Sequence, residues 1–232
     1  MTDAHDESPG VPADDDAPQH AARAHDHAGP PAHTAAEWDQ RYASEERLWS
    51  GRPNGALVAE VAGLAPGRVL DVGCGEGGDA VWLARQGWDV TALDVSAVAL
   101  ERTARHAREA GVEVRCVHAG IVEAGLPDGA FDLVSVQYPA LPRTPTLDAE
   151  RALLAAVAVG GTLLVVHHAE VDMEQAGAGG FDPADYVGHA GVVGALGEGW
   201  LVEVDEQRPR DVPAGRGGHH VRDDVLRARR LA

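Results

Sequence analysis

The chain has 232 residues, of which 44% are hydrophobic, so it is long enough for one α/β domain with a buried core. It contains no lysine, and 37 acidic residues against 19 arginines give a formal net charge of −18. A surface this acidic repels phosphate backbones, which argues against nucleic acid as a partner and favours small or cationic ligands.

The first 36 residues are predicted to form a disordered acidic tail. They lack large apolar side chains to bury, and their histidines are irregularly spaced, which favours a solvated tail over a metal site. No signal peptide is visible, and the longest near-apolar run, 153–166, is too short to span a membrane. Cys74 and Cys116 lie in apolar surroundings and are expected to be reduced core residues in a cytoplasmic protein.

An ordered single domain is predicted over residues 37–232, beginning with a helix and a loop that ends at Pro53, then a helix over 55–64. Strands and helices alternate from there. In chain order we predict a strand at 68–72, a helix at 79–87, a strand at 89–95, a helix at 96–111, strands at 112–118 and 129–138, a helix at 147–159, a strand at 161–168, a helix at 181–196, and strands at 200–208 and 219–231.

Several boundaries rest on capping residues. Ser96 is a predicted N-cap, Gly111 a helix stop, and Asp182 a cap followed by Pro183 at the first helical position. Alternating strands and helices predict a mostly parallel, doubly wound sheet with helices on both faces. Two consecutive strands at the C-terminus predict a hairpin with one antiparallel strand. Ligands of such a sheet bind at the carboxyl ends of the strands, at the switch point.

The stretch VLDVGCGEGG at 69–78 holds the most informative loop. Gly73, Gly75 and Gly78 fit G-x-G-x-x-G, the dinucleotide-binding pattern. However, Asp71 ends the preceding strand and would oppose a pyrophosphate, whereas it would favour the cationic end of S-adenosylmethionine (SAM). An NAD-dependent oxidoreductase stays open as an alternative, although a Tyr-x-x-x-Lys dyad is impossible without lysine. Asp94, about 20 residues past the loop, suits ribose hydroxyls in both ligand classes.

Four blocks, VLDVGCGEGG, ALDVS, LPDGAFDLVSVQY and GGTLLVV, together resemble the class I SAM-dependent methyltransferases over about residues 55–232. The resemblance implies a Rossmann-like seven-stranded sheet with an antiparallel last strand, and SAM as the cofactor. The blocks LWSGRPN and HH…D…VLRARR are similar to bacterial tellurite-resistance and thiopurine-type small-molecule methyltransferases. A small-molecule acceptor, with neither nucleic acid nor membrane as partner, is therefore expected.

The resemblance also implies which residues would bind the cofactor. The family often places an acid after its third strand to bind the adenine amino group, and this chain has Gly120 there, which motivates a third reading as a non-catalytic nucleoside-binding regulatory protein. The implied cofactor-binding residues are Asp71, Gly73, Cys74 and Gly75 for the methionine end, Asp94, Val95 and Ser96 for the nucleoside, Gly120 and Ile121 for the adenine edge, and Gln137 at the methyl-transfer site.

Methyl transfer from SAM mainly requires alignment of the acceptor with the methyl carbon. A thiol or chalcogen oxyanion acceptor needs no strong base, whereas hydroxyl and amine acceptors usually do. The candidate catalytic residues are Tyr138, His168 and His220. Neighbours on a strand point to opposite faces, so at most one histidine of each adjacent pair enters the site. No zinc-ligand spacing is present, and no metal is expected.

Overall fold

A computed structural model of the chain describes residues 34–169, 182–210 and 221–232, all within one unit that spans 31–232. Residues 1–33 of the tail predicted at 1–36, and the candidate His220, lie outside the described residues. The first helix begins at Ala35, two residues before the predicted domain boundary, because Thr34 and Glu37 form a capping box. No described helix is long and apolar enough to cross a membrane.

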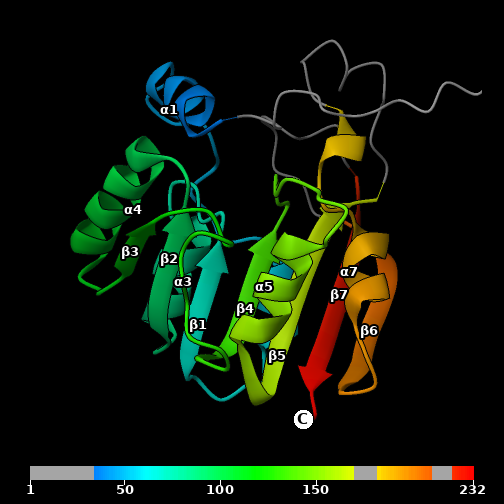
Figure 1. Cartoon of the computed structure of the whole chain (residues 1–232). Coiled ribbons are helices and arrows are strands. Elements are labelled where there is room, and N and C mark those ends of the chain that lie inside the picture. The colour runs from blue at the N-terminus through cyan, green and yellow to red at the C-terminus, as the bar shows by residue number, and fades with distance from the viewer. Residues whose placement is uncertain (1–33, 170–181, 211–220) are drawn as a thin grey trace, which may run out of the picture. The chain divides into compact units, whose positions relative to one another are not determined.

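The domain is built on a seven-stranded sheet in the order β3-β2-β1-β4-β5-β7-β6 (Figure 1). The strands are β1 (Arg68–Val72), β2 (Asp89–Asp94), β3 (Arg115–His118), β4 (Phe131–Gln137), β5 (Val157–His168), β6 (Trp200–Pro209) and β7 (Arg222–Arg230). β1 to β5 pair in parallel, while β7 runs antiparallel to both β5 and β6. The predicted fold class is confirmed, including the C-terminal hairpin.

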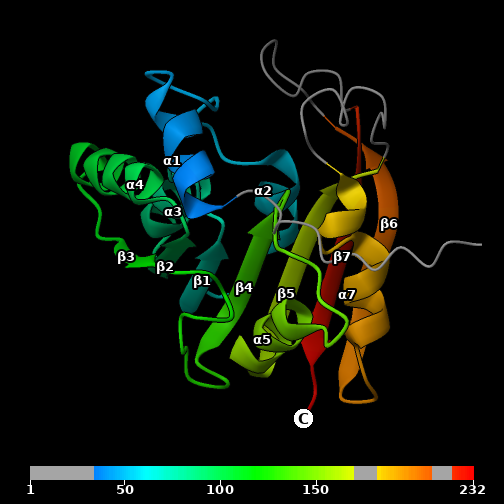
Figure 2. The ribbon, with the colours of Figure 1, turned by 45° about the horizontal axis from the view of Figure 1, so that its top comes forward.

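Helices cover both faces of the sheet (Figure 2). They are α1 (Ala35–Ala43), α2 (Gly55–Val61), α3 (Gly78–Arg85), α4 (Ala97–Ala110), α5 (Asp148–Ala156) and α7 (His189–Ala195), with a 3-10 turn at Pro183–Asp185. Because strand side chains alternate between faces, Val69 and Leu133 pack with α2, α3 and α4, whereas Leu70 and Val134 pack with α5 and α7. We call these the α3 face and the α5 face.

The switch point of this sheet lies between β1 and β4. The chain proceeds from β1 to β2 and β3 on one side, then returns to place β4 and β5 on the other. Asp71 and Ser135 are register partners in the parallel β1–β4 pair. The carboxyl ends of these two strands therefore meet where doubly wound folds bind their ligands.

Predictions that rest on local capping are confirmed. The Ser96 hydroxyl accepts from the Ala99 N–H at the start of α4, and Gly111 ends that helix with φ +68°. Gly111 adopts this left-handed conformation without the clash that a Cβ would introduce. β1 has the predicted bounds, 68–72.

Two predicted helices are wrong in part. The helix predicted at 147–159 ends at Ala156, and Val157 already pairs with Phe131 in β5, as suits a β-branched residue. The single helix predicted at 181–196 is a 3-10 turn followed by the separate α7. Asp182 caps the turn as predicted, but Tyr186 then forms a bridge with Pro142, so a tertiary contact interrupts the helix.

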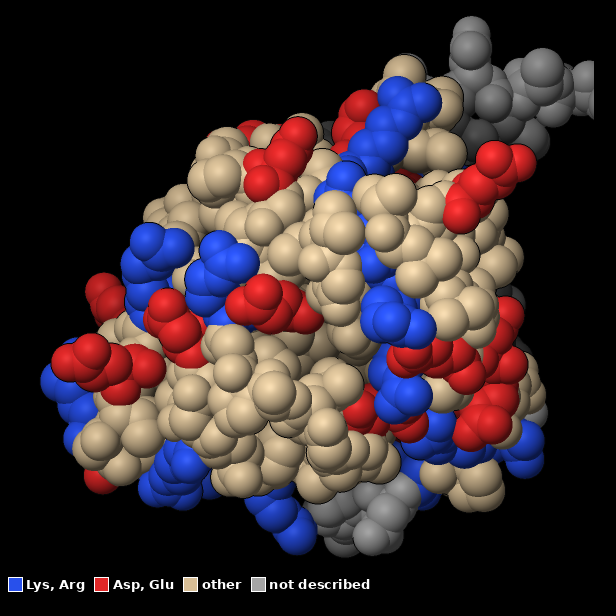
Figure 3. Space-filling view, turned by 90° about the horizontal axis from the view of Figure 1, so that it is seen from below, with Lys and Arg blue, Asp and Glu red and all other residues tan. Residues whose placement is uncertain are grey.

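Acidic and basic side chains lie close together on the face seen in Figure 3. Several acidic and basic side chains of the described residues form ion pairs. Glu60 on α2 pairs with Arg208 at 2.7 Å and with Arg227 at 2.9 Å, while Glu203 on β6 pairs with Arg227 and Arg229 on β7. These contacts join α2 to the C-terminal hairpin.

Candidate cofactor and acceptor site

The glycine loop that follows β1 is held by the main chain. Gly73, Gly75 and Gly77 all have positive φ, at +69°, +53° and +82°. A Cβ at Gly77 would lie 2.7 Å from the Thr103 side chain on α4, so that position requires glycine for space as well as for conformation. The Gly73 N–H also donates to the Leu93 carbonyl at 2.8 Å, which fixes the loop against β2.

Asp71 points to the α3 face at the end of β1 and is only 2% exposed. Its carboxylate accepts the Ala80 N–H in the first turn of α3. Its Oδ2 has no hydrogen-bond partner among the described residues. Burial, followed by the nearby Asp79 and Asp94 carboxylates, raises the pKa of Asp71 well above its usual range. One oxygen of this acid is thus left to accept a donor from elsewhere.

Gln137 ends β4 on the same face. Its Nε2 donates to the Ser135 hydroxyl at 3.1 Å, and its Oε1 is buried without a partner in the described part of the chain. Since Ser135 is the register partner of Asp71, the Gln137 side chain lies diagonally across the β1–β4 pair from Asp71. The switch point therefore carries two buried acceptor atoms for which the described ranges supply no donor.

Asp94 ends β2 and is 8% exposed. Its Oδ2 accepts the Gly75 N–H and its Oδ1 the Ser96 N–H, both at 2.9 Å. Burial raises the pKa of Asp94, and these hydrogen bonds oppose that effect. Asp94 therefore positions the glycine loop, a role the sequence did not indicate, and each oxygen retains a lone pair. The Ser96 hydroxyl is used internally, donating to Asp39 on α1 at 2.6 Å.

The residues predicted at the adenine edge follow β2 and β3. Ile121 is buried in the α5-face core, while Val95 and Gly120 are half-buried. A Cβ at Gly120 would collide with the Glu123 carboxylate, so an acidic side chain from three residues further on lies beside the position where the family often carries its acid. Sequence reasoning missed Glu123 because it lies outside the position where the family carries its acid.

The segment before α2 covers the loop through contacts that sequence reasoning also missed. Glu76, within the glycine loop, accepts the Leu48 N–H at 3.1 Å and the Trp49 N–H at 2.9 Å. It also forms a 2.6 Å ion pair with Arg102 on α4, whose guanidinium donates to the Tyr42 carbonyl. We call this the Glu76 clamp. Its partners Leu48, Trp49 and Arg102 lie 26 to 28 residues from Glu76 in the sequence, and no motif signals them.

A second contact of this segment involves α3. The carboxylate of Asp79 accepts both the backbone N–H and the side-chain amide of Asn54, each at 2.7 Å. Burial raises the pKa of Asp79 to about 6 despite these hydrogen bonds. Above the loop, the Tyr42 hydroxyl accepts from Trp49 Nε1 and would lie 3.0 Å from a Cβ at Gly75. The N-terminal segment thus lies directly over the glycine loop.

The sequence and the fold of this chain are similar to those of known methyltransferases. Residues 69–160 match the model of the family described as "Methyltransferase domain". Residues 69–160 thus form the core of a methyltransferase domain of the class I SAM-dependent type. It is 40% identical over 111 residues to an uncharacterized methyltransferase of Mycobacterium tuberculosis, covering 48% of this chain and 55% of that protein. The chain thus spans about half the length of the curated relatives it matches.

Other similarities are narrower or concern the fold. Ribosomal RNA small subunit methyltransferase C of Alcanivorax borkumensis is 34% identical over 115 residues, covering 47% of this chain and 35% of that one. A solved structure concerned with conversion of a disulfide bond into a thioacetal in echinomycin biosynthesis has a TM-score of 0.68 and 25% identity, covering 85% and 92% of the two chains. The [4+2]-cyclase SpnF, with a TM-score of 0.60 and 23% identity over 87% and 98%, shares the fold.

In this methyltransferase domain, two of the candidate catalytic residues lie together. Tyr138 directly follows β4, and its ring stacks on the His168 ring with centroids 4.3 Å apart. Its hydroxyl donates to Asp223 on β7 at 2.9 Å. His167, the residue before His168, points to the α5 face, where its Nε2 lies 3.0 Å from the Val187 carbonyl. Burial there lowers the pKa of His167 to about 4. The expectation that adjacent histidines diverge is confirmed.

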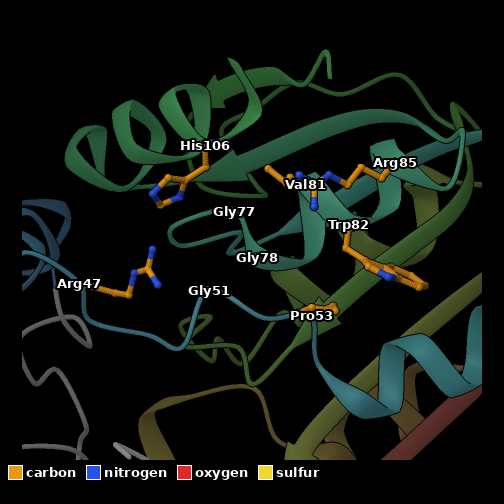
Figure 4. A pocket seen from close by; sticks show the side chains of 9 residues that line it. All are labelled: Arg47, Gly51, Pro53, Gly77, Gly78, Val81, Trp82, Arg85 and His106. Carbon is orange, nitrogen blue, oxygen red and sulfur yellow. The ribbon is translucent and has the colours of Figure 1, made fainter. Parts of the chain in front are cut away.

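The methyltransferase domain also has a pocket of about 130 Å³ on the outer side of the glycine loop (Figure 4). It is lined by Arg47, Gly51, Pro53, Gly77, Gly78, Val81, Trp82, Arg85 and His106. Its lining includes none of the predicted cofactor-binding residues, so it is distinct from the switch point. His106 Nδ1 lies 2.8 Å from the Glu76 carbonyl, which links this wall to the Glu76 clamp.

Metal ligands and thiols can be assessed for the ranges that the structure describes. Within them, no group of three or more His, Cys, Asp or Glu side chains is arranged to hold a metal ion. Cys74 and Cys116 are both free. The Cys74 sulfur packs in the core near the Thr103 hydroxyl, and burial raises the pKa of its thiol, so only its backbone can take the predicted cofactor role.

Proposed function

We propose that this domain transfers a methyl group from SAM to a small-molecule acceptor by in-line displacement. The observation that carries the proposal is a pair of buried acceptors at the switch point, Asp71 Oδ2 and Gln137 Oε1, which no residue that the structure describes hydrogen-bonds. Such atoms are stabilised by a ligand that brings donors. The ammonium group of SAM brings three N–H donors, whereas a pyrophosphate brings none, so the pair favours SAM over NAD.

The surrounding residues fit the rest of the cofactor. Gly77 starts α3 without a side-chain cap, so N–H groups of the loop and first turn suit the carboxylate of SAM. Asp94 has lone pairs left for the ribose hydroxyls, and the Glu123 carboxylate suits the adenine amino group. When bound, SAM supplies an activated methyl group with a neutral thioether as leaving group. The protein aligns the acceptor and excludes water, and the Glu76 clamp suits the second task.

A small acceptor is favoured by charge. The net charge of −18 opposes a phosphate backbone, even though one relative is named for ribosomal RNA. Among small acceptors, a thiol or chalcogen oxyanion would need only alignment, whereas a hydroxyl would also need a proton acceptor. The alternative of an NAD-dependent oxidoreductase predicts that NADH binds. The alternative of a non-catalytic nucleoside-binding protein predicts that no acceptor is methylated.

The test is thermal unfolding of the full chain with SAM, S-adenosylhomocysteine and NADH, each added alone. A ligand present at about 100 times its Kd stabilises the fold by about 2.7 kcal/mol, a clear shift in Tm. We expect a shift with SAM and with S-adenosylhomocysteine and none with NADH. A shift with NADH alone would contradict the proposal. Methylation of any acceptor, detected as S-adenosylhomocysteine release, would eliminate the non-catalytic alternative.

A further inference from the structure

The pocket on the outer side of the glycine loop has no part in the proposed methyl transfer. Three of its lining side chains, those of Arg47, Arg85 and His106, are basic, and none is acidic. We propose that this pocket binds a phosphate oxyanion, either inorganic phosphate or the phosphate group of a small monoester, and that the bound anion ties the segment 47–53 to α3. The site goes beyond the proposed function, and only its effect on SAM binding rests on that function.

The three basic side chains reach the pocket from three separate segments. Arg47 lies in the segment before α2, Arg85 in the last turn of α3, and His106 on α4. Figure 4 shows their polar ends directed from different sides toward the loop at Gly77 and Gly78. The fold therefore gathers basic groups that are far apart in the sequence around one cavity.

Helix α3 presents one stripe of residues to the pocket. Gly78, Val81, Trp82 and Arg85 all line it, and their spacing of three and four residues places them on one face of the helix. Side chains on a helix lean toward its N-terminus, so Arg85 reaches back past Val81 toward the glycine loop, as Figure 4 shows. Trp82 and Pro53 add an apolar wall, which suits the organic part of a phosphate monoester.

The position of the Arg47 guanidinium is set by Gly51. A Cβ at Gly51 would lie 3.3 Å from Nη1, 3.4 Å from Cζ and 3.8 Å from Nη2 of Arg47. The guanidinium group is thus packed against the backbone at Gly51 instead of extending away from the protein. Gly51 has a φ of +71°, a conformation that glycine adopts without strain. A side chain at position 51 would therefore disturb both the turn and the guanidinium.

The two arginines lack an internal counter-charge. Neither the Arg47 nor the Arg85 side chain has an ion pair or a hydrogen bond within the ranges that the structure describes. The carboxylate of Glu76, in the adjacent loop, is already used by Arg102 and by backbone N–H groups. In a chain with 37 acidic residues and 19 arginines, a pocket with two such arginines and no acid is a local exception. Guanidinium groups bind phosphate oxygens through paired N–H donors, so a phosphate would supply the missing charge.

The walls of the pocket are joined to the Glu76 clamp. His106 Nδ1 lies 2.8 Å from the Glu76 carbonyl, and Arg47 directly precedes Leu48, whose N–H donates to the Glu76 carboxylate. An anion that contacts both Arg47 and Arg85 would link this segment to α3 and hold it over the glycine loop. Because that loop is the proposed cofactor site, the anion and SAM would each increase the affinity of the protein for the other.

The first experiment measures binding of two probes, inorganic phosphate and phenyl phosphate, to the full chain by isothermal titration calorimetry. Sodium chloride keeps the ionic strength constant, so that general screening of this acidic protein does not vary. We expect saturable binding at one site. Arg47→Gln and Arg85→Gln should each weaken it about tenfold or more, because each removes a charge-assisted contact. Tighter binding of phenyl phosphate would indicate a monoester as the ligand, and equal binding would indicate the free ion.

The chain offers matched controls for both arginines. Arg52, in the same segment as Arg47, and Arg108, on α4, are exposed and do not line the pocket. Arg52→Gln and Arg108→Gln change the net charge by the same amount as the pocket variants, and we expect them to alter probe affinity less than about twofold. Absence of saturable binding to wild type, or equal losses in the control and pocket variants, would overturn the site. Thermal unfolding without probe checks that all four variants fold.

The second experiment separates this site from the proposed function. The affinity for S-adenosylhomocysteine is measured with and without saturating phenyl phosphate, in wild type and in Arg85→Gln. We expect phenyl phosphate to tighten S-adenosylhomocysteine binding about fivefold or more in wild type and to have no effect in Arg85→Gln. If S-adenosylhomocysteine does not bind at all, the proposed function fails, while the first experiment still decides the anion site. If it binds equally with and without the probe, the inferred link between the two sites is wrong.

Discussion

The cofactor half and the acceptor half of this domain are held together by different groups. Around β1 and β2, backbone N–H groups of the glycine loop donate to the Leu93 carbonyl and to Asp94. Around β5 and β7, side chains from distant segments pair instead, such as Tyr138 with Asp223, 85 residues apart. Under the proposed function, the main chain would fix where the cofactor binds, and a few side chains would decide what can bind beside it. The same fold can keep its cofactor while its acceptor changes.

The largest expected difference between the halves is in how much stability is lost when an ion pair is broken. Arg102→Ala would leave Glu76, whose side chain is 2% exposed, without its cation, and we expect a loss of about 3–5 kcal/mol in the free energy of unfolding. Arg229→Ala removes the half-exposed partner of Glu203 in the C-terminal hairpin, and we expect a loss below about 1 kcal/mol. Urea denaturation measures both. Equal losses would contradict the distinction between the Glu76 clamp and the hairpin pairs.

The two halves should also respond to pH in opposite directions. His167 has its pKa lowered from 6.5 to about 4 by burial, so the unfolded chain binds its proton more readily between these values. Its contribution to stability therefore falls as the pH drops from about 6.5 to 4, by about 3 kcal/mol in all. His167→Gln should remove this acid sensitivity from thermal unfolding measured across that range. A variant with the wild-type slope would show that His167 charges freely in the fold.

Asp79, in the cofactor half, is expected to change stability with pH in the opposite direction to His167. Burial raises its pKa from 3.8 to about 6, so the folded state binds its proton more readily than the unfolded chain does. Its contribution to stability is therefore largest at acid pH and falls by about 3 kcal/mol as the pH rises from 3.8 to 6. Asp79→Asn should make the measured stability rise more steeply with pH over this window. Asp89→Asn, at an exposed position, is the control.

The smallest change in stability should accompany a large change in binding. Asp71→Asn removes a buried carboxylate whose pKa is raised, so we expect the ligand-free protein to be as stable as wild type or slightly more stable. A hydrogen bond to a charged group contributes about 1.5–3 kcal/mol, so SAM affinity should fall about 10- to 150-fold by calorimetry. Unchanged affinity would contradict the charge argument for this loop, and the Asp132→Asn variant, at a half-exposed position, should bind SAM as wild type does.

The sequence predicted those features that neighbouring residues determine. The strand at 68–72, the Ser96 cap and the Gly111 stop are local, and the structure has them where expected. The helix predicted at 181–196 failed because Tyr186 pairs with Pro142, a contact that no local pattern encodes. The hydrogen bond between Tyr138 and Asp223 was missed for the same reason, since it depends on where β7 lies in the sheet. The order of residues along the chain does not predict which strands are neighbours in the sheet, whereas it shows directly that Asp71 precedes a glycine loop.

Gly120 and Glu123 illustrate how such a site can change over time. The Glu123 carboxylate occupies the space that a side chain at 120 would fill, so the two positions compete for one place beside the adenine edge. An acid introduced at 120 would be repelled by Glu123, yet the same substitution would be tolerated once Glu123 is replaced. The effect of mutating either position thus depends on the state of the other. Positions 120 and 123 are therefore expected to form an epistatic pair, and relatives that carry the acid at one position are expected to lack it at the other.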